Sequence, residues 1–200
     1  MLANSKILSV IIVAFLMISC GGEETSKGDA LFGAGKYQQA IAAYTEYVKL
    51  HPTHVASFYN RGRSYEELKN YDQSFKDFNK VLELDERNFN AHLSLSKHYY
   101  RDRAYAKSLI HSKRVVELNG SVAQGHFLIA RNNHQMGNVK EAMKSYDQAI
   151  ELNENLGEAY LYRGALHVYN KNNGRACSDF KNAKNLNISE ADDVLSKYCK

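Results

Sequence analysis

Apolar and small residues recur with helical spacing in two neighbouring segments of the chain. The apolar face of residues 55–68 contains Phe58, Gly62 and Tyr65. The apolar face of residues 71–84 contains Tyr71, Phe78, Val81 and Leu84. Spacings of four and seven residues place side chains on one side of a helix. The short polar break at residues 69–70 predicts that the two helices form an antiparallel hairpin.

The same pattern returns every 34 residues. We call each position of the 34-residue repeat a phase. One phase is leucine in every copy: Leu50, Leu84, Leu118, Leu152 and Leu186. Small residues occupy two others: Gly28, Gly62, Ser96, Ala130 and Gly164, then Ala40, Ser74, Ser108, Ala142 and Ala176. They let the paired helices approach closely, and larger residues fill the surrounding space. One such hairpin buries too little apolar surface to offset its ordering entropy, so the hairpins must stack into an α-solenoid.

A 34-residue repeat with this content resembles the tetratricopeptide repeat family. The resemblance covers residues 21–188 and implies an all-α fold of five helix hairpins. The expected repeats are residues 21–54, 55–88, 89–122, 123–156 and 157–188. Repeat helices are expected over 27–188, and a C-terminal capping helix over 189–200. Ser189 and Asp192 have the spacing of a capping box at the start of that helix.

Two parts of the solenoid are expected to be weaker than the rest. Gly28 and Gly33 lie within the first helix, residues 27–34, and each disfavours a helix by about 1 kcal/mol relative to Ala. Its end of the solenoid is therefore expected to fray. The third repeat has His92 and Ser112 where larger aromatic residues are usual, so it is expected to be the least well packed of the central repeats.

The first 20 residues differ in kind from the repeats. Lys6 precedes an apolar run over residues 7–18, which is too short to cross a bilayer and indicates a secretory signal peptide, residues 1–19. Residues 16–20 resemble the lipobox of bacterial lipoproteins, which implies that Cys20 carries lipid and that residues 20–26 form a tether. An uncleaved anchor or a general signal peptide are the alternatives. The expected location is the bacterial membrane, with the outer membrane of a Gram-negative cell favoured because no Asp follows Cys20.

Two cysteines, Cys177 and Cys199, lie near the C-terminus. Each lies about 10 residues from a turn near residues 187–188, so antiparallel helices would place them at similar heights. An exported compartment permits a disulfide, which would contribute about 3 kcal/mol for a loop of roughly 20 residues. Two buried free thiols are the alternative.

The sequence has no residue pattern typical of catalysis, of a metal site or of a cofactor site. No nucleophile elbow, phosphate-binding loop or helical histidine pair is present, and His51 and His54 lie in a turn beside Pro52. A formal charge of +4 over 200 residues is too low for a nucleic-acid-binding stripe. The sequence therefore predicts a protein that is not an enzyme and uses no cofactor.

The family resemblance implies that the first helix of each repeat lines a concave groove. One groove phase holds Asp29, Arg63, Lys97, Arg131 and Ala165, so three consecutive repeats carry a cation. Neighbouring phases hold Tyr59, Asn60, Leu93, Tyr100, Arg101, Phe127, Leu128, Leu161, Tyr162 and Tyr169. Cations among aromatic residues suit a peptide with acidic and apolar side chains. The alternative is that the cations pair with local acids such as Glu66 and Glu67.

One specific ligand of the family does not fit. Members that hold the C-terminal carboxylate of heat-shock chaperones use basic and Asn residues at five places. The equivalent positions here are Thr25, Asp29, Asn60, Asn90 and Ser94, of which Asn60 alone matches.

The preferred functional interpretation is a lipid-anchored scaffold or adaptor that binds a protein or peptide partner in the bacterial cell envelope. The alternative is an accessory or carrier subunit of an envelope polysaccharide or peptidoglycan enzyme system. Rows of Trp would have favoured the alternative, and the chain has no Trp.

Overall fold

The computed structural model describes residues 22–199, with side chains from Lys27 onward, and all of the regular structure in this range is helical. The expected signal peptide, residues 1–19, and the expected lipidation site Cys20 lie outside the described residues. No described helix is both long and apolar enough to cross a membrane.

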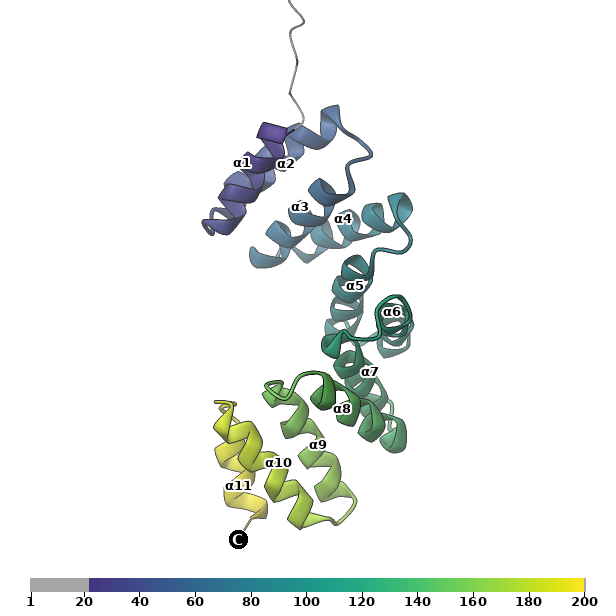
Figure 1. The fold of residues 1–200 in the computed structure, drawn as a ribbon, viewed down its shortest axis with the longest axis vertical. Helices are drawn as coiled ribbons and strands as arrows, with labels where there is room; N and C mark the ends of the chain where they lie inside the picture. The colour runs from purple at the N-terminus through teal and green to yellow at the C-terminus, as the bar shows by residue number, and fades with distance from the viewer. Residues whose placement is uncertain (1–21, 200) are drawn as a thin grey trace, which may run out of the picture.

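Within residues 22–199, ten helices form five successive hairpins, and an eleventh helix follows. The first six are α1 (Gly22–Gly33), α2 (Tyr37–Leu50), α3 (Val55–Glu67), α4 (Tyr71–Leu84), α5 (Phe89–Arg101) and α6 (Tyr105–Leu118). The others are α7 (Ala123–Gln135), α8 (Val139–Leu152), α9 (Gly157–Tyr169), α10 (Asn173–Asn185) and α11 (Ala191–Tyr198). Figure 1 shows them stacked in chain order along the long axis, with α1 and α2 at one end and α11 at the other. The predicted all-α solenoid is confirmed.

The turn inside each hairpin has one residue in the left-handed backbone region. These residues are 34 positions apart, and their φ angles are 71° at Gly35, 58° at Lys69, 58° at Arg103, 78° at Gly137 and 58° at Lys171. Glycine adopts this conformation without strain, whereas the three basic residues do so at a cost of about 1 kcal/mol each. The turn geometry is therefore imposed by the hairpin and not by the residue type.

Small residues mark the closest contact between paired helices, as the pattern predicts. A Cβ on Gly62 would lie 2.8 Å from the Phe78 ring, and one on Gly28 would lie 2.5 Å from the Tyr44 ring. The aromatic residues of this phase are fully buried: Tyr44, Phe78, Tyr146 and Phe180 are at most 1% exposed. Gly28 is thus required by packing, although its helix propensity is poor.

The third hairpin has a polar interior. Ser96 Oγ donates to the Ser108 carbonyl at 3.0 Å, and Ser108 Oγ donates to the Ser96 carbonyl at 2.7 Å. Asn132 Nδ2 of the next hairpin donates to Ser108 Oγ at 2.9 Å. Ser112, which stands in the aromatic phase, is also fully buried. Hydrogen bonds here take the place of the aromatic contact found in the other hairpins.

Two boundaries differ from the predictions. Residues 22–26, predicted to belong to the tether, are helical, and α1 begins at Gly22. Helix propagation beyond a packed segment is favourable even where the sequence is polar. The predicted capping box is wrong, because α11 begins at Ala191 with Glu190 as its N-cap. The Ser189 hydroxyl donates instead to the Glu190 carboxylate at 2.8 Å.

The C-terminal helix covers the last hairpin. Ala191 is buried with Leu161, Phe180 and Ala183, and partly buried residues surround them: Ile188, Val194, Leu195 and Tyr198. A disulfide joins Cys177 of α10 to Cys199, with the two Cα atoms 5.6 Å apart. This crosslink holds the end of α11 against α10, so the solenoid has a covered C-terminal face.

Candidate binding groove

Side chains from successive first helices meet along one face of the solenoid. The contacts join residues 31 positions apart: Asn60 to Asp29, Arg131 to Tyr100 and Arg131 to Tyr162. We call this surface the groove face and define it by the predicted groove residues on α1, α3, α5, α7 and α9. Its chemistry changes along its length.

In the N-terminal part of the groove face, Asp29 already accepts hydrogen bonds from within the chain. Tyr44 donates its hydroxyl to Asp29 Oδ1 at 2.5 Å, and Asn60 Nδ2 donates to the same oxygen at 2.9 Å. Burial and the neighbouring Asp29 raise the pKa of Tyr44, so its hydroxyl stays protonated. Asp29 therefore has two protein donors.

Arg63 is also engaged by local acids. Its guanidinium lies 3.3 Å from Glu66 Oε2 and 3.8 Å from Glu67 Oε1. Burial raises the pKa of Glu66, and the charges of Arg63, Lys97 and Arg101 oppose that rise. The predicted row of cations is thus interrupted at this end by a carboxylate that the cations surround.

Arg131 is held differently, between aromatic rings. Its Nε donates to the Tyr100 hydroxyl at 3.0 Å, and its guanidinium carbon lies 4.0 Å from the centre of the Tyr162 ring and 4.7 Å from that of Tyr100. Among the described side chains, residues 27–199, its two terminal nitrogens have no hydrogen-bond or ion-pair partner. Stacked guanidinium groups are oriented with little loss of donor capacity. Arg131 therefore presents a fixed fork of donors.

Arg101 and Lys97 complete the cationic part of the groove face. Arg101 lies 3.5 Å over the Tyr71 ring, contacts His98 Nδ1 at 2.6 Å and lies 3.4 Å from Asp102. Lys97 is exposed. The helical spacing placed Tyr71 on the apolar face of residues 71–84, and its role as a support for Arg101 was not predicted. The aromatic-to-arginine spacing of about one repeat is the signal that could have revealed it.

Several predicted groove residues lie elsewhere. Phe127 is 2% exposed and packs in the core with Tyr146, so its assignment to the partner-binding surface is wrong. Leu128 and Leu161 are likewise buried. The first helix of each hairpin packs against helices on two sides. Its solvent-exposed face is therefore narrower than the positions in the repeat alone suggest. Tyr59 and Leu93 are half-buried, and Tyr169 is 73% exposed.

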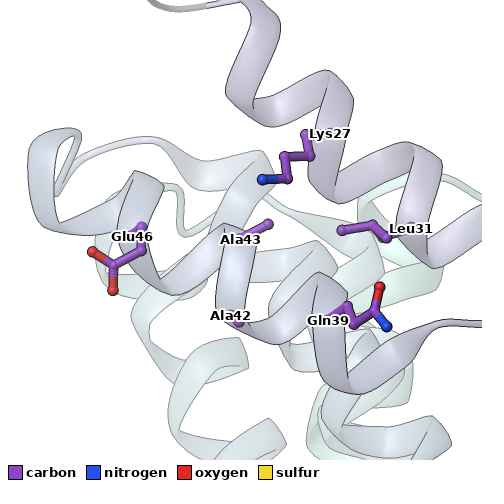
Figure 2. Close-up of a pocket in the computed structure, with 6 residues that line it drawn as sticks. All are labelled: Lys27, Leu31, Gln39, Ala42, Ala43 and Glu46. Atoms are coloured by element: carbon purple, nitrogen blue, oxygen red, sulfur yellow. The ribbon is translucent and has the colours of Figure 1, made fainter.

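Two hollows lie near the ends of the described solenoid. One of 390 Å³ is lined by Tyr169 and Ala165 of the groove face together with His134, Gly137, Val139 and Leu166. Another of 480 Å³ lies on the first hairpin, where Lys27 and Leu31 of α1 face Gln39, Ala42, Ala43 and Glu46 of α2 (Figure 2). The first extends the groove face beyond Arg131 toward the C-terminal hairpin.

The sequence pattern did not reveal a largely buried ion pair, because its two members lie 16 positions apart on the two helices of one hairpin. Arg61 donates to Asp77 at 2.7 and 2.8 Å, and Arg163 makes the same two bonds to Asp179 at 2.7 and 2.9 Å. Each arginine also reaches the preceding repeat, at Thr45 or Asp147. The pair of the second repeat thus recurs in the fifth repeat, three repeats later, and this recurrence is visible in the sequence.

The fold and the groove face define a helical-repeat scaffold with a surface for a macromolecular partner. The profile of the tetratricopeptide repeat matches residues 25–88, and a second profile with the same description matches residues 123–156. The chain belongs to the tetratricopeptide repeat family. Proteins of this family bind protein or peptide partners.

Individual relatives share the fold at low identity. Small glutamine-rich tetratricopeptide repeat-containing protein 2 of Saccharomyces cerevisiae is 25% identical over 66% of this chain and 36% of its own length. MamA from Desulfovibrio magneticus has a TM-score of 0.74 at 16% identity, covering 84% of this chain and 97% of that one. YrrB, described as a repeat protein with an unusual peptide-binding site, has a TM-score of 0.70 at 19% identity, covering 83% and 86%. The chain spans 8% to 36% of the length of the first curated relatives that it matches.

Proposed function

We propose that this protein is a lipid-anchored adaptor of the bacterial cell envelope that binds a peptide with acidic and apolar side chains on its groove face. The observation that carries the proposal is Arg131, whose guanidinium is fixed by Tyr100 and Tyr162 while its terminal nitrogens stay free. A carboxylate can accept two parallel hydrogen bonds from such a fork. Lys97 lies one repeat away and adds attraction for an acidic segment.

The two ends of the groove face differ in what they can bind. Asp29 and Arg63 are already paired within the chain, so they offer few free charges to a ligand. The section from Lys97 to Tyr169 has two cations, Lys97 and Arg131, without an ion-pair partner among residues 27–199, together with the exposed ring of Tyr169 and the 390 Å³ hollow. We therefore place the acidic residues of the bound peptide against Lys97 and Arg131, and an apolar residue near Tyr169.

Peptide binding is tested with a displayed library in which acidic and apolar residues alternate, compared with the same library carrying Lys in place of each acid. We expect acidic peptides alone to be retained. Arg131→Gln should weaken the best binder about tenfold, equivalent to about 1.4 kcal/mol. Arg87→Gln is the matched control, because Arg87 is exposed in the turn between α4 and α5.

Each variant is first checked by circular dichroism and thermal melting, so that a loss of binding is not a loss of fold. Equal retention of both libraries, or an unchanged affinity in Arg131→Gln, would overturn the assignment of the groove face. Retention of peptidoglycan fragments in place of peptide would favour the alternative function, an accessory or carrier subunit of an envelope polysaccharide or peptidoglycan enzyme system.

Lipid anchoring rests on the sequence around Cys20. The test expresses the full chain in a Gram-negative host that is grown in medium containing an alkyne fatty acid. The fatty acid labels proteins that are lipidated in the cell. We expect label on the wild-type protein and on Cys177→Ser, and none on Cys20→Ser, which should also leave the membrane fraction. Label that persists in Cys20→Ser would contradict the proposal.

A further inference from the structure

The third hairpin brings two histidines into direct contact, outside the groove face. Nδ1 of His92, on α5, lies 2.9 Å from Nδ1 of His111, on α6, and the two rings are tilted by 42°. Both side chains are half-buried. The ring of Tyr99 stacks on His111 with centroids 5.4 Å apart and fixes its plane.

The hydrogen bonds of His92 define which nitrogen carries its proton. His92 Nε2 lies 3.1 Å from the carbonyl oxygen of Glu86, which can only accept a hydrogen bond. The proton of neutral His92 is therefore assigned to Nε2, and Nδ1 keeps its lone pair. His111 then donates its Nδ1 proton across the contact. Metal-binding histidines have this arrangement, with the second ring nitrogen bonded to a backbone carbonyl.

Both rings are held in the neutral form that binds metals. Burial lowers the pKa of His92, and burial together with the neighbouring His92 lowers the pKa of His111 to about 4. Neutral imidazole nitrogens are the commonest metal ligands among side chains.

The corresponding positions in other repeats hold a different group. In the second repeat Phe58 stands at the place of His92 and Asp77 at that of His111, and Arg61 fills the space beside them. The residue corresponding to Arg61 in the third repeat is Leu95, which is fully buried. The histidine pair therefore has no guanidinium at the place where the second and fifth repeats have one.

We propose that His92 and His111 form a binding site for a divalent transition-metal ion that favours a tetragonal arrangement, such as Cu²⁺ or Ni²⁺. Two nitrogen ligands at right angles, each about 2.0 Å from one ion, lie about 2.8 Å apart, close to the 2.9 Å between the two Nδ1 atoms, and both rings turn on binding so that their lone pairs point to the ion and not to each other. Binding requires His111 to move its proton from Nδ1 to Nε2 through solvent, with no change in its total charge. No three His, Cys, Asp or Glu side chains converge among the side chains described, residues 27–199, so water supplies the remaining ligands.

The surrounding charges are compatible with a cation. Asp85 and Glu117 both act on His92 with negative charge, and Arg114 acts with positive charge. The Arg114 guanidinium lies 3.1 Å from Glu117, which offsets its repulsion. Lys107 lies 5.6 Å from the centre of the Tyr99 ring, which stacks on His111.

The fourth repeat provides a matched control. His126 lies one repeat after His92 and makes the same contact, with Nε2 3.0 Å from the Gly120 carbonyl oxygen. Its partner position, the equivalent of His111, is Ser145. His126 thus makes the backbone contact of His92 without a second imidazole.

The test titrates CuSO₄ into the full chain without a histidine tag and follows heat and the Cu²⁺ electron paramagnetic resonance spectrum. We expect one site with two coordinated nitrogens. His92→Phe and His111→Ser should each weaken it by about tenfold or more, since loss of even an outer-sphere partner costs that much. His126→Phe should leave the affinity unchanged.

Two results would overturn the proposal. One is a wild-type spectrum with fewer than two coordinated nitrogens, which needs no variant and so does not depend on variant folding. The other is an affinity that falls in His126→Phe as much as in His111→Ser. Because neither histidine belongs to the groove face, peptide binding by the wild-type protein would be unaffected by either outcome.

Discussion

The second hairpin, α3 with α4, and the third, α5 with α6, have helices of 13 and 14 residues in the same order, yet their interiors differ in kind. The second hairpin packs the Phe78 ring over Gly62 and buries an arginine–aspartate pair. In the third, two serines hydrogen-bond each other at the positions of Gly62 and Ser74, and a histidine pair stands at the positions of Phe58 and Asp77. The difference teaches that the repeat fixes where side chains meet, and leaves open whether they meet through apolar or polar contact.

The largest effect is expected from a substitution that removes the aromatic contact of the second hairpin. Phe78→Ala should lower the free energy of unfolding by about 3–5 kcal/mol, because it leaves a cavity in a fully buried site. Ser112→Ala, at the same phase of the third hairpin, should cost about 1 kcal/mol or less, since it removes one hydrogen bond. Urea unfolding followed by circular dichroism measures both. Equal losses would show that the two interiors contribute alike.

A smaller effect is expected from the ion pair. The side chains of Arg61 and Asp77 are 15% and 7% exposed, so Asp77→Ala leaves a nearly buried guanidinium without its carboxylate and should cost about 3 kcal/mol. Burial raises the pKa of Asp77 more than Arg61 lowers it, so desolvation of the carboxylate outweighs its attraction to Arg61.

The matched variant therefore replaces both partners together. Arg61→Ile with Asp77→Ser introduces the residue types that the fourth repeat has at Ile129 and Ser145. This double variant should be within about 1 kcal/mol of the wild type. A double variant as unstable as Asp77→Ala would mean that the pair itself is strongly stabilising.

The smallest expected effect is the acid sensitivity of the third hairpin. The pKa of His111 is about 4 when folded and rises toward its ordinary value of 6.5 on unfolding, so the unfolded chain binds more protons between these values. Stability from this group is complete above pH 6.5 and is lost as the pH falls toward 4.

Comparison with His111→Ser isolates that loss. Between pH 7 and pH 4.5 the wild type should lose about 1–2 kcal/mol more than the variant, after allowance for partial solvent screening. Carboxylates with raised pKa values, Glu66 and Asp77, have the opposite pH dependence but are common to both proteins. Parallel stability curves for the two proteins would contradict the assignment.

Much of the fold could be predicted because the repeat leaves a trace in every copy. The phase of Phe78 and that of Gly62 located the contact inside each hairpin, and the structure places both there. The prediction of a capping box at Ser189 was wrong, because two residues with the right spacing do not decide which backbone group is free to be capped. The left-handed turn residues Lys69 and Arg103 could not be foreseen, since their side chains carry no preference for that conformation.

The groove could be predicted only in outline. Phase identified Arg63 and Arg131 as equivalent, yet one is paired with Glu66 and the other is held between two tyrosines. Those partners come from the same helix in the first case and from neighbouring repeats in the second. The position of a residue in the repeat indicates neither the direction in which a long side chain points nor which of several neighbouring groups it pairs with.

The sequence by itself determined the all-α solenoid, its 34-residue period and the burial of its aromatic phase, because these follow from the local spacing of small and large residues. The tertiary structure alone decided that Arg131 keeps free donors, that Phe127 is buried and that His92 meets His111. Each of these depends on side chains brought together from different helices, and their distances and burial exist only once the helices have packed.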